Sequence, residues 1–259
     1  MSLHAVESGD SAREFLTTQW SVVLSCSEQE GDKAKAALSQ LCRTYWRPIF
    51  TFICRRGYSV SDAQDLTQDF FVIVLKRSLL HSADPMRGRF RSLLLKSLQN
   101  FLIDANEKRN AGKRGGGVDF VVWDDWMAEA PSQLCFPAKI LETWPAERLY
   151  DLRWAATVAE QALRRLSEEC ESRGRRRVFD TLQGHLVPER SDISYEELAV
   201  LLGIKLPEVK RLAHQMRARY RTILREEVAR TVDSAADIEE EIRYLCAVLA
   251  TSTSERNSS

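Results

Sequence analysis

The sequence predicts an all-α fold of two helical domains joined by an acidic linker. Glycine and proline are sparse, with 11 and 7 among 259 residues, and 29% of the residues are charged, a composition typical of helix-rich soluble proteins. Apolar residues recur at spacings of three and four along most of the chain, which is the period of an amphipathic helix. Hydrophobic residues, at 44%, suffice for ordinary cores, and the length suits one large or two small domains.

The chain carries no net charge, but its charges are segregated. Residues 85–117 contain eight Lys/Arg and two acids, net +6, and residues 203–225 contain seven Lys/Arg and one acid, again net +6. Residues 118–151 contain seven acids and two basic residues, net −5. Two separated basic segments predict two contacts with a polyanion and an acidic connector between them.

The first ordered helix is expected from Thr17, after a disordered tail at residues 1–16. The next helix carries Tyr45 and neighbouring apolar residues toward a core, and Pro48 within it predicts a break or kink. Gly57 then ends the segment in the manner of a glycine that follows a helix.

A helix with one acidic face follows. Ser61 is expected to cap it, with Gln64 completing a capping box. Its apolar face comprises Ala63, Leu66, Phe70, Ile73 and Val74. Its polar face comprises Asp62, Asp65, Gln68, Asp69 and Lys76, with Phe71, Val72 and Leu75 at the edges. An acidic stripe bordered by exposed apolar residues suits docking onto a basic protein surface, and the alternative is a solvated helix face.

A basic helix comes after a loop at 81–88. The helical period predicts an inward face that comprises Phe90, Leu93, Leu94, Leu98, Phe101, Leu102 and Ala105. The predicted outward face comprises Arg91, Lys96, Asn100, Asp104 and Lys108. A basic face can be merely solvated. Here it adjoins Arg87 and Arg89 and ends in a glycine-rich basic tail at 113–117, which favours contact with phosphates.

Residues 118–144 have three Trp, two Pro and no periodicity, which predicts a linker that partly docks, and the alternative is a mere spacer. The expected division of the chain is therefore a tail, a helical domain, a linker, a second helical domain and a carboxy-terminal helix, at residues 1–16, 17–117, 118–150, 151–232 and 233–259.

The second domain contains a helix-turn-helix pattern. Ser194 to Glu197 form a capping box, Gly203 supplies the left-handed turn, and a second helix is expected over 206–224. Its buried face comprises Val209, Ala213, Met216, Tyr220 and Ile223. Its exposed face comprises Lys210, Arg211, His214, Gln215, Ala218 and Arg221, with Arg217 and Arg219 as further basic residues. Such a unit usually binds DNA, and the alternative is a purely structural three-helix unit.

Beyond it, Ile238, Ile242, Leu245 and Leu249 repeat at helical spacing around the acidic run Glu239 to Glu241. This helix packs on its own domain, occludes DNA or binds a regulator, and the first alternative is favoured. Occlusion would pair its acidic face with the basic residues of the helix-turn-helix domain.

These segments together resemble bacterial sigma factors of the extracytoplasmic-function type. The resemblance covers roughly two-thirds of the chain. It rests on the helix-turn-helix and on five ordered motifs: Tyr45-Trp46-Arg47-Pro48, Gly57-Tyr58, Asp62 to Gln68, Gly88 to Arg91, and Lys113 to Gly117.

The resemblance implies a region-two bundle at 17–117, a region-four helix-turn-helix at 151–232, and a linker that follows the RNA-exit path of the polymerase. It implies binding to core RNA polymerase through Asp62, Asp65, Gln68, Asp69 and Val72. It implies melting of the promoter minus-ten element by Arg87, Arg89, Arg91, Lys96, Asn100, Asp104, Lys108 and Arg109. It implies recognition of the minus-thirty-five element by Lys210, Arg211, His214, Gln215, Arg217 and Arg221.

Two positions depart from the family pattern. Leu93 stands where the family commonly has Trp, so that stacking on a base would come from Phe90 or Phe101. Lys205-Leu206-Pro207 replaces the usual Ser cap of the recognition helix, although proline is tolerated in a first turn.

Other classes of function lack support in the sequence. The six cysteines are scattered without a C-x-x-C pair, and the four histidines lie in unrelated contexts, so that we expect no metal, disulfide or cofactor. No catalytic constellation is present, and we expect no enzymatic activity. The chain lacks a long apolar run and an amino-terminal signal pattern, which favours a cytoplasmic protein without a membrane contact.

The expected partners are core RNA polymerase and promoter DNA, with an anti-sigma factor as a further candidate and the monomer as the expected state. The main alternative is a stand-alone helix-turn-helix regulator in which residues 17–117 bind a ligand or dimerise. A helical nuclease or other enzyme is the third class.

Overall fold

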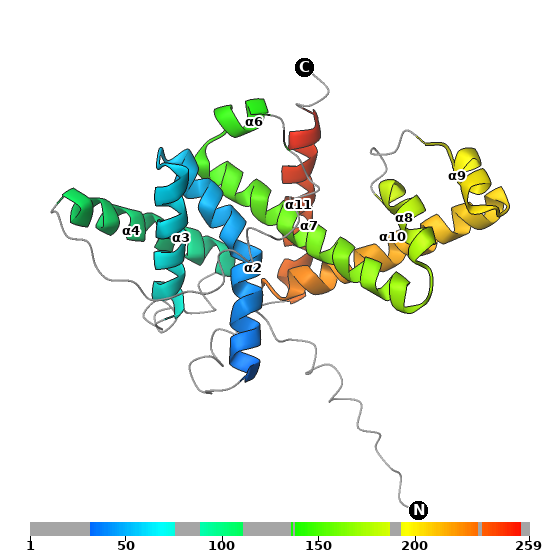
Figure 1. The fold of residues 1–259 in the computed structure, drawn as a ribbon, viewed down its shortest axis with the longest axis horizontal. Coiled ribbons are helices and arrows are strands. Elements are labelled where there is room, and N and C mark those ends of the chain that lie inside the picture. The colour runs from blue at the N-terminus through cyan, green and yellow to red at the C-terminus, as the bar shows by residue number, and fades with distance from the viewer. Residues whose placement is uncertain are drawn as a thin grey trace, which may run out of the picture. The chain divides into compact units, whose positions relative to one another are not determined.

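The described residues are helical. The computed structural model describes residues 32–75, 89–110, 136, 138–186, 193–232 and 235–254, and these contain helices and no strand (Figure 1), which confirms the all-α prediction. None of these helices is both long and apolar enough to cross a membrane. Five predicted features lie outside the described residues: the tail at 1–16, the helix expected from Thr17, the loop at 81–88, the basic tail at 113–117 and the first part of the linker, 118–135.

The chain forms two compact units. Unit 1 comprises the described residues up to Thr157 and those from Val228 onward, and unit 2 comprises Val158–Glu227. Unit 1 contains α2 (Asp32–Arg55), α3 (Val60–Leu75), α4 (Phe90–Asn110), α6 (Ala138–Thr143), the start of α7 (Ala146–Ser172) and α11 (Ala235–Ser254). Unit 2 contains the rest of α7, α8 (Arg176–Leu182), η2 (Gln183–His185), α9 (Tyr195–Leu202) and most of α10 (Leu206–Ala229).

Helix α2 runs through Pro48 without ending there, so of the predicted break or kink the break is absent. Proline in a helix interior loses one hydrogen bond and crowds the preceding turn, at a cost of about 3 kcal/mol or more. Burial of the flanking residues Tyr45 and Ile49 offsets this cost, since both are fully inaccessible to solvent. Gly57 has a φ of +93° directly after the helix, as predicted for the glycine that ends this segment.

Helix α3 begins earlier than predicted. It starts at Val60, and its cap is Ser59, whose Oγ accepts a hydrogen bond from the backbone N–H of Asp62 at 3.1 Å. The expected cap Ser61 therefore lies inside the helix. Phe71 is also fully buried rather than at an exposed edge, because the buried arc of α3 is wider than predicted.

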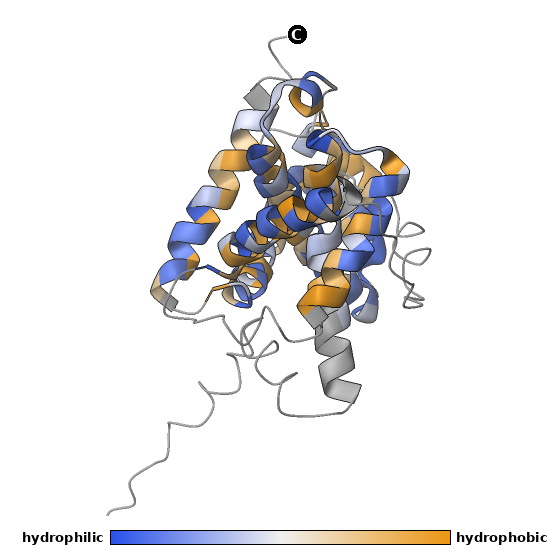
Figure 2. Ribbon diagram, turned by 90° about the vertical axis from the view of Figure 1, so that its left-hand side faces the viewer, coloured by the Kyte–Doolittle hydropathy of each residue, from blue (hydrophilic) through white to orange (hydrophobic). Residues whose placement is uncertain are grey.

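Aromatic side chains connect the helices of unit 1. Phe90 of α4 meets Tyr45 of α2 edge-on, with ring centroids 5.6 Å apart. Tyr150 of α7 meets Phe52 of α2 in the same way at 6.4 Å. Apolar and polar residues alternate along these helices (Figure 2), as expected for helices that each bury one face.

The last part of the expected linker is helical. Residues 138–150 form α6 and the start of α7, and Ile140, Trp144 and Leu149 are buried. Val248 and Leu249 of α11 pack against this cluster. Arg55 of α2 donates hydrogen bonds to the carbonyls of Glu142 and Trp144, both at 2.8 Å, which satisfies acceptors at the end of α6. Tertiary contacts thus order a segment that has no periodicity of its own.

Unit 2 contains the predicted helix-turn-helix. Ser194 caps α9 in a full capping box: Ser194 Oγ accepts from the N–H of Glu197 at 3.2 Å, and Glu197 Oε2 accepts from the N–H of Ser194 at 2.7 Å. Gly203 follows with φ +69° and ψ +30°, the left-handed conformation that the turn requires. Gly174, with φ +67°, separates α7 from α8.

Candidate nucleic-acid interface

The two faces of α10 are those that the spacing predicts. The inward residues Val209, Ala213, Met216, Tyr220 and Ile223 are all buried. The predicted outward residues are all exposed: Lys210, Arg211, His214, Gln215, Ala218 and Arg221. The helix begins at Leu206, and Pro207 sits in its first turn, where no helical hydrogen bond needs its missing N–H. A cationic, solvent-facing surface therefore lies on the second helix of a helix-turn-helix.

Two other arginines of α10 are bonded to side chains within unit 2. Arg217 is half-buried and donates a hydrogen bond to the hydroxyl of Tyr195 at the start of α9. Arg219 makes a two-point contact with Glu169 of α7, from Nε to Oε2 at 2.7 Å and from Nη2 to Oε1 at 2.5 Å. The hydrogen bond from Arg219 lowers the pKa of Glu169. Arg217, which the resemblance assigns to the minus-thirty-five element, thus has a partner within unit 2, as does Arg219, whereas Arg221 is exposed.

A third arginine, which is not among the predicted site residues, contacts the end of α9. Arg177 of α8 donates from Nη2 to the carbonyl of Leu201 at 2.8 Å, near the end of α9. Its neighbour Arg176 is an exposed ion-pair partner of Glu171 and Asp180. Arg177 thus links α8 to the end of α9, and the signal for it in the sequence is the basic run at 173–177.

The acidic face of α3 is exposed at its centre. Asp65 and Asp69 are exposed, one helical turn apart, and Asp62, Gln68 and Val72 are half-buried. Partial burial, together with the nearby charge of Asp65, raises the pKa of Asp69. A cationic group beside Asp69 would stabilise its ionised form, which suits a surface that meets a basic partner.

The basic residues assigned to α4 do not form one surface. Lys96, Asn100 and Asp104 are exposed as predicted. Lys108 and Arg109 belong to the helix, but their side chains lie outside the described set, as does all of Arg87. The prediction that Arg91 faces outward is wrong, because only 7% of its side chain is exposed.

The aromatic residues expected to replace the missing tryptophan differ in access. Phe90 is fully buried against Tyr45, so it cannot stack on a base in this arrangement. Phe101 is half-buried, with its ring 5.5 Å from that of Phe70. Of the two predicted candidates, only Phe101 has a side chain that is partly accessible to solvent.

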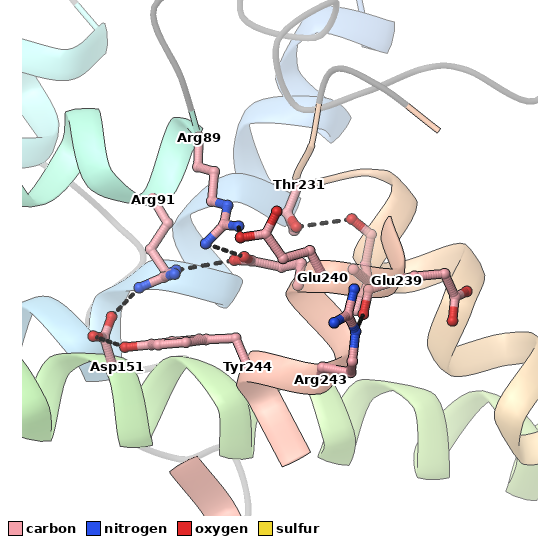
Figure 3. Close-up of polar contacts among 10 residues, drawn as sticks. Arg89, Arg91, Asp151, Thr231, Glu239, Glu240, Arg243 and Tyr244 are labelled. Atoms are coloured by element: carbon pink, nitrogen blue, oxygen red, sulfur yellow. Dashed lines mark hydrogen bonds and ion pairs between the residues drawn. The ribbon is translucent and has the colours of Figure 1, made fainter. Parts of the chain in front are cut away.

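Arg91 is the centre of a charged network that joins three helices (Figure 3). It is paired with Asp151 of α7 through Nη1, and its Nε donates to Glu241 Oε1 of α11 at 3.1 Å. The hydroxyl of Tyr244 donates to the other oxygen of Asp151. The Arg91 guanidinium also lies 4.8 Å from the ring centroid of Trp154 and 4.7 Å from that of Tyr244.

Arg89, the residue before α4, extends this network. Its Nη2 lies 2.6 Å from Glu240 Oε1 and its Nη1 lies 3.0 Å from Glu241 Oε2. The side chain of Glu241 is 1% exposed and that of Glu240 is 62% exposed. The acidic run of α11 therefore meets the basic start of α4 within unit 1. These contacts do not support the alternative in which the acidic run occludes the helix-turn-helix domain.

The network contains charged side chains that are buried. Burial disfavours a charged guanidinium, but the carboxylates of Asp151 and Glu241 outweigh this effect and raise the pKa of Arg91. Burial and the hydrogen bond to Asp151 raise the pKa of Tyr244 to about 12.

Comparison with known proteins adds no assignment to this geometry. Among the residues that the structure describes, no group of three or more His, Cys, Asp or Glu side chains is placed to hold a metal ion. No family model matches the sequence, and no curated protein or solved structure matches it.

Proposed function

We propose that this chain is a sigma factor of the extracytoplasmic-function type, which binds core RNA polymerase, opens the minus-ten element and reads the minus-thirty-five element. The observation that carries the proposal is the exposed cationic face of a capped helix-turn-helix that follows, in the family's order, an exposed acidic helix face. In this assignment the α2 to α4 segment is region two and the helix-turn-helix is region four. Core RNA polymerase and promoter DNA are the partners.

The recognition role falls to the first turns of α10. Lys210, Arg211 and His214 are exposed near the start of the helix, the part that reaches base edges when a recognition helix enters the major groove. Arg221, two turns farther along, is better placed for the phosphate backbone.

The polymerase role falls to α3. Asp65 and Asp69 share an exposed face, and Gln68 and Val72 border it. Charge complementarity with a basic surface fits this face, and the raised pKa of Asp69 means that a cationic partner would stabilise its ionised form.

Run-off transcription with purified core polymerase tests the proposal directly. A sigma factor yields a promoter-dependent transcript when added to core enzyme. A stand-alone helix-turn-helix regulator binds duplex DNA without yielding that transcript, and a helical enzyme does neither. Absence of the transcript on promoters selected from a random library would refute the proposal.

The acidic face itself is tested by Asp65→Lys combined with Gln68→Ala. We expect this variant to lose co-purification with core polymerase while its helical circular dichroism is unchanged, because Asp65 is exposed, Gln68 is only half-buried and alanine favours a helix. Glu107→Lys, on the exposed end of α4, makes the same change of charge on a different helix and should retain binding. Full binding by the double variant contradicts the assignment of α3.

A further inference from the structure

We infer that Glu240 of α11 occupies, with its carboxylate, the place of a nucleic-acid phosphate on Arg89, so that a nucleic-acid strand and Glu240 compete for this guanidinium. The inference rests on the proposed function only in that it uses a nucleic-acid strand as the competing ligand. Its evidence is the geometry at the start of α4 (Figure 3), where Arg89 Nη2 lies 2.6 Å from Glu240 Oε1.

The two carboxylates that contact Arg89 differ in burial and in their other partners. Glu241 is buried and also holds Arg91, so its removal would leave a buried cation with fewer partners. Glu240 is mostly exposed, and the ion pair that the structure gives it is with Arg89. Arg91 retains Asp151 and Glu241 whether or not Glu240 is present. Glu240 can therefore leave Arg89 without disturbing the buried network.

The site left behind suits a phosphate. Arg89 directly precedes Phe90, the first residue of the 21-residue helix α4, where the backbone N–H groups and the helix dipole favour an anion. A guanidinium binds phosphate oxygens with the same fork geometry that it uses for carboxylates. The Arg89 side chain is 26% exposed, so a strand reaches it from solvent once Glu240 turns away. The ligand class is a phosphodiester backbone, and Glu240 weakens its binding.

Glu240→Gln in the full chain tests this competition. Binding is measured by fluorescence anisotropy of a labelled single-stranded oligonucleotide at low salt. Because the Glu240 side of this ion pair is largely exposed, we expect its loss to tighten binding by about two- to fivefold. Replacing Arg89 with Ala in the Glu240→Gln background should abolish the gain.

Glu239→Gln is the matched control. It changes the net charge equally, one residue away, and its carboxylate points away from Arg89 in Figure 3. A gain confined to Glu240→Gln and dependent on Arg89 supports the inference. An unchanged affinity, an equal gain in Glu239→Gln, a gain that survives Arg89→Ala, or no oligonucleotide binding by any variant would overturn it.

This measurement is separable from the test of function. Oligonucleotide binding requires no polymerase, so a chain that fails in run-off transcription can still show the competition at Arg89. Conversely, an active transcription factor whose affinity does not respond to Glu240→Gln retains the proposed function and loses this inference alone.

Discussion

The two basic segments, 85–117 and 203–225, carry the same net charge of +6, yet their arginines serve different purposes. At the start of α4, Arg89 and Arg91 are paired with carboxylates of α7 and α11. On α10, Arg211 and Arg221 face solvent. The net charge of a segment thus says little about how much of that charge a polyanion can reach.

Burial accounts for the difference. A cation removed from water needs partners of opposite sign, and Arg91 has two carboxylates and two aromatic rings around it. An exposed cation needs none, and it remains available to phosphates. Even α10 contains both kinds, since Arg219 pairs with Glu169 while Arg221, two residues on, is exposed.

Arg91→Ala should have the largest effect on this comparison. It leaves Asp151 and the buried Glu241 without their shared cation, which we expect to destabilise unit 1 by about 3–5 kcal/mol. Lys96→Ala on the exposed face of the same helix should change stability by no more than about 0.5 kcal/mol. Urea unfolding, monitored by hydrogen exchange of the α4 amides, measures both changes in stability. If Arg91→Ala costs as little stability as Lys96→Ala, the network does not stabilise the fold.

Substitutions on the exposed face of α10 should change DNA binding rather than folding. We expect Arg211→Ala to cost about 1–3 kcal/mol at one position of the minus-thirty-five element and to relax the preference there. Arg221→Ala should weaken binding to all sequences alike and reduce the salt dependence. Mobility-shift titrations over a panel of single-base variants separate the two. Exchanged behaviour of the two variants would mean that the base-reading residues lie farther along the helix.

The smallest effect is expected at Arg219, the internally paired arginine of α10. Glu169→Gln removes a partly exposed ion pair, with side chains 36% and 23% exposed, and should cost about 0.2–1 kcal/mol at neutral pH. The hydrogen bond from Arg219 lowers the pKa of Glu169 in the folded state, so its contribution is present above the unfolded carboxyl pKa of about 4.3 and is lost as pH falls through the folded pKa.

Thermal denaturation at a series of pH values checks this prediction. The wild-type chain and Glu169→Gln should differ at neutral pH and converge in acid. A difference that grows as the pH falls would show that the ion pair is not its source.

Local patterns predicted the helix-turn-helix well. The capping box at Ser194, the left-handed Gly203 and both faces of α10 follow from rules that act within a few residues, and all are present. Where two local signals competed the prediction was less successful. Ser59 and Ser61 both offer a hydroxyl at the start of α3, and Ser59 is the cap because α3 already begins at Val60. The spacing also placed Arg91 on an outward face of α4, where long-range partners bury it.

By itself, then, the sequence determined that the chain is helical, where most of its described helices lie, and which residues of α10 face solvent, because helical period and capping are local properties. Only the tertiary structure decided the fate of the basic residues at the start of α4. The partner of Arg91 on α11 lies 150 residues away in the chain, and the one on α7 lies 60 residues away. No spacing rule spans such distances, and the pairing follows from which helices pack together to bury their apolar faces.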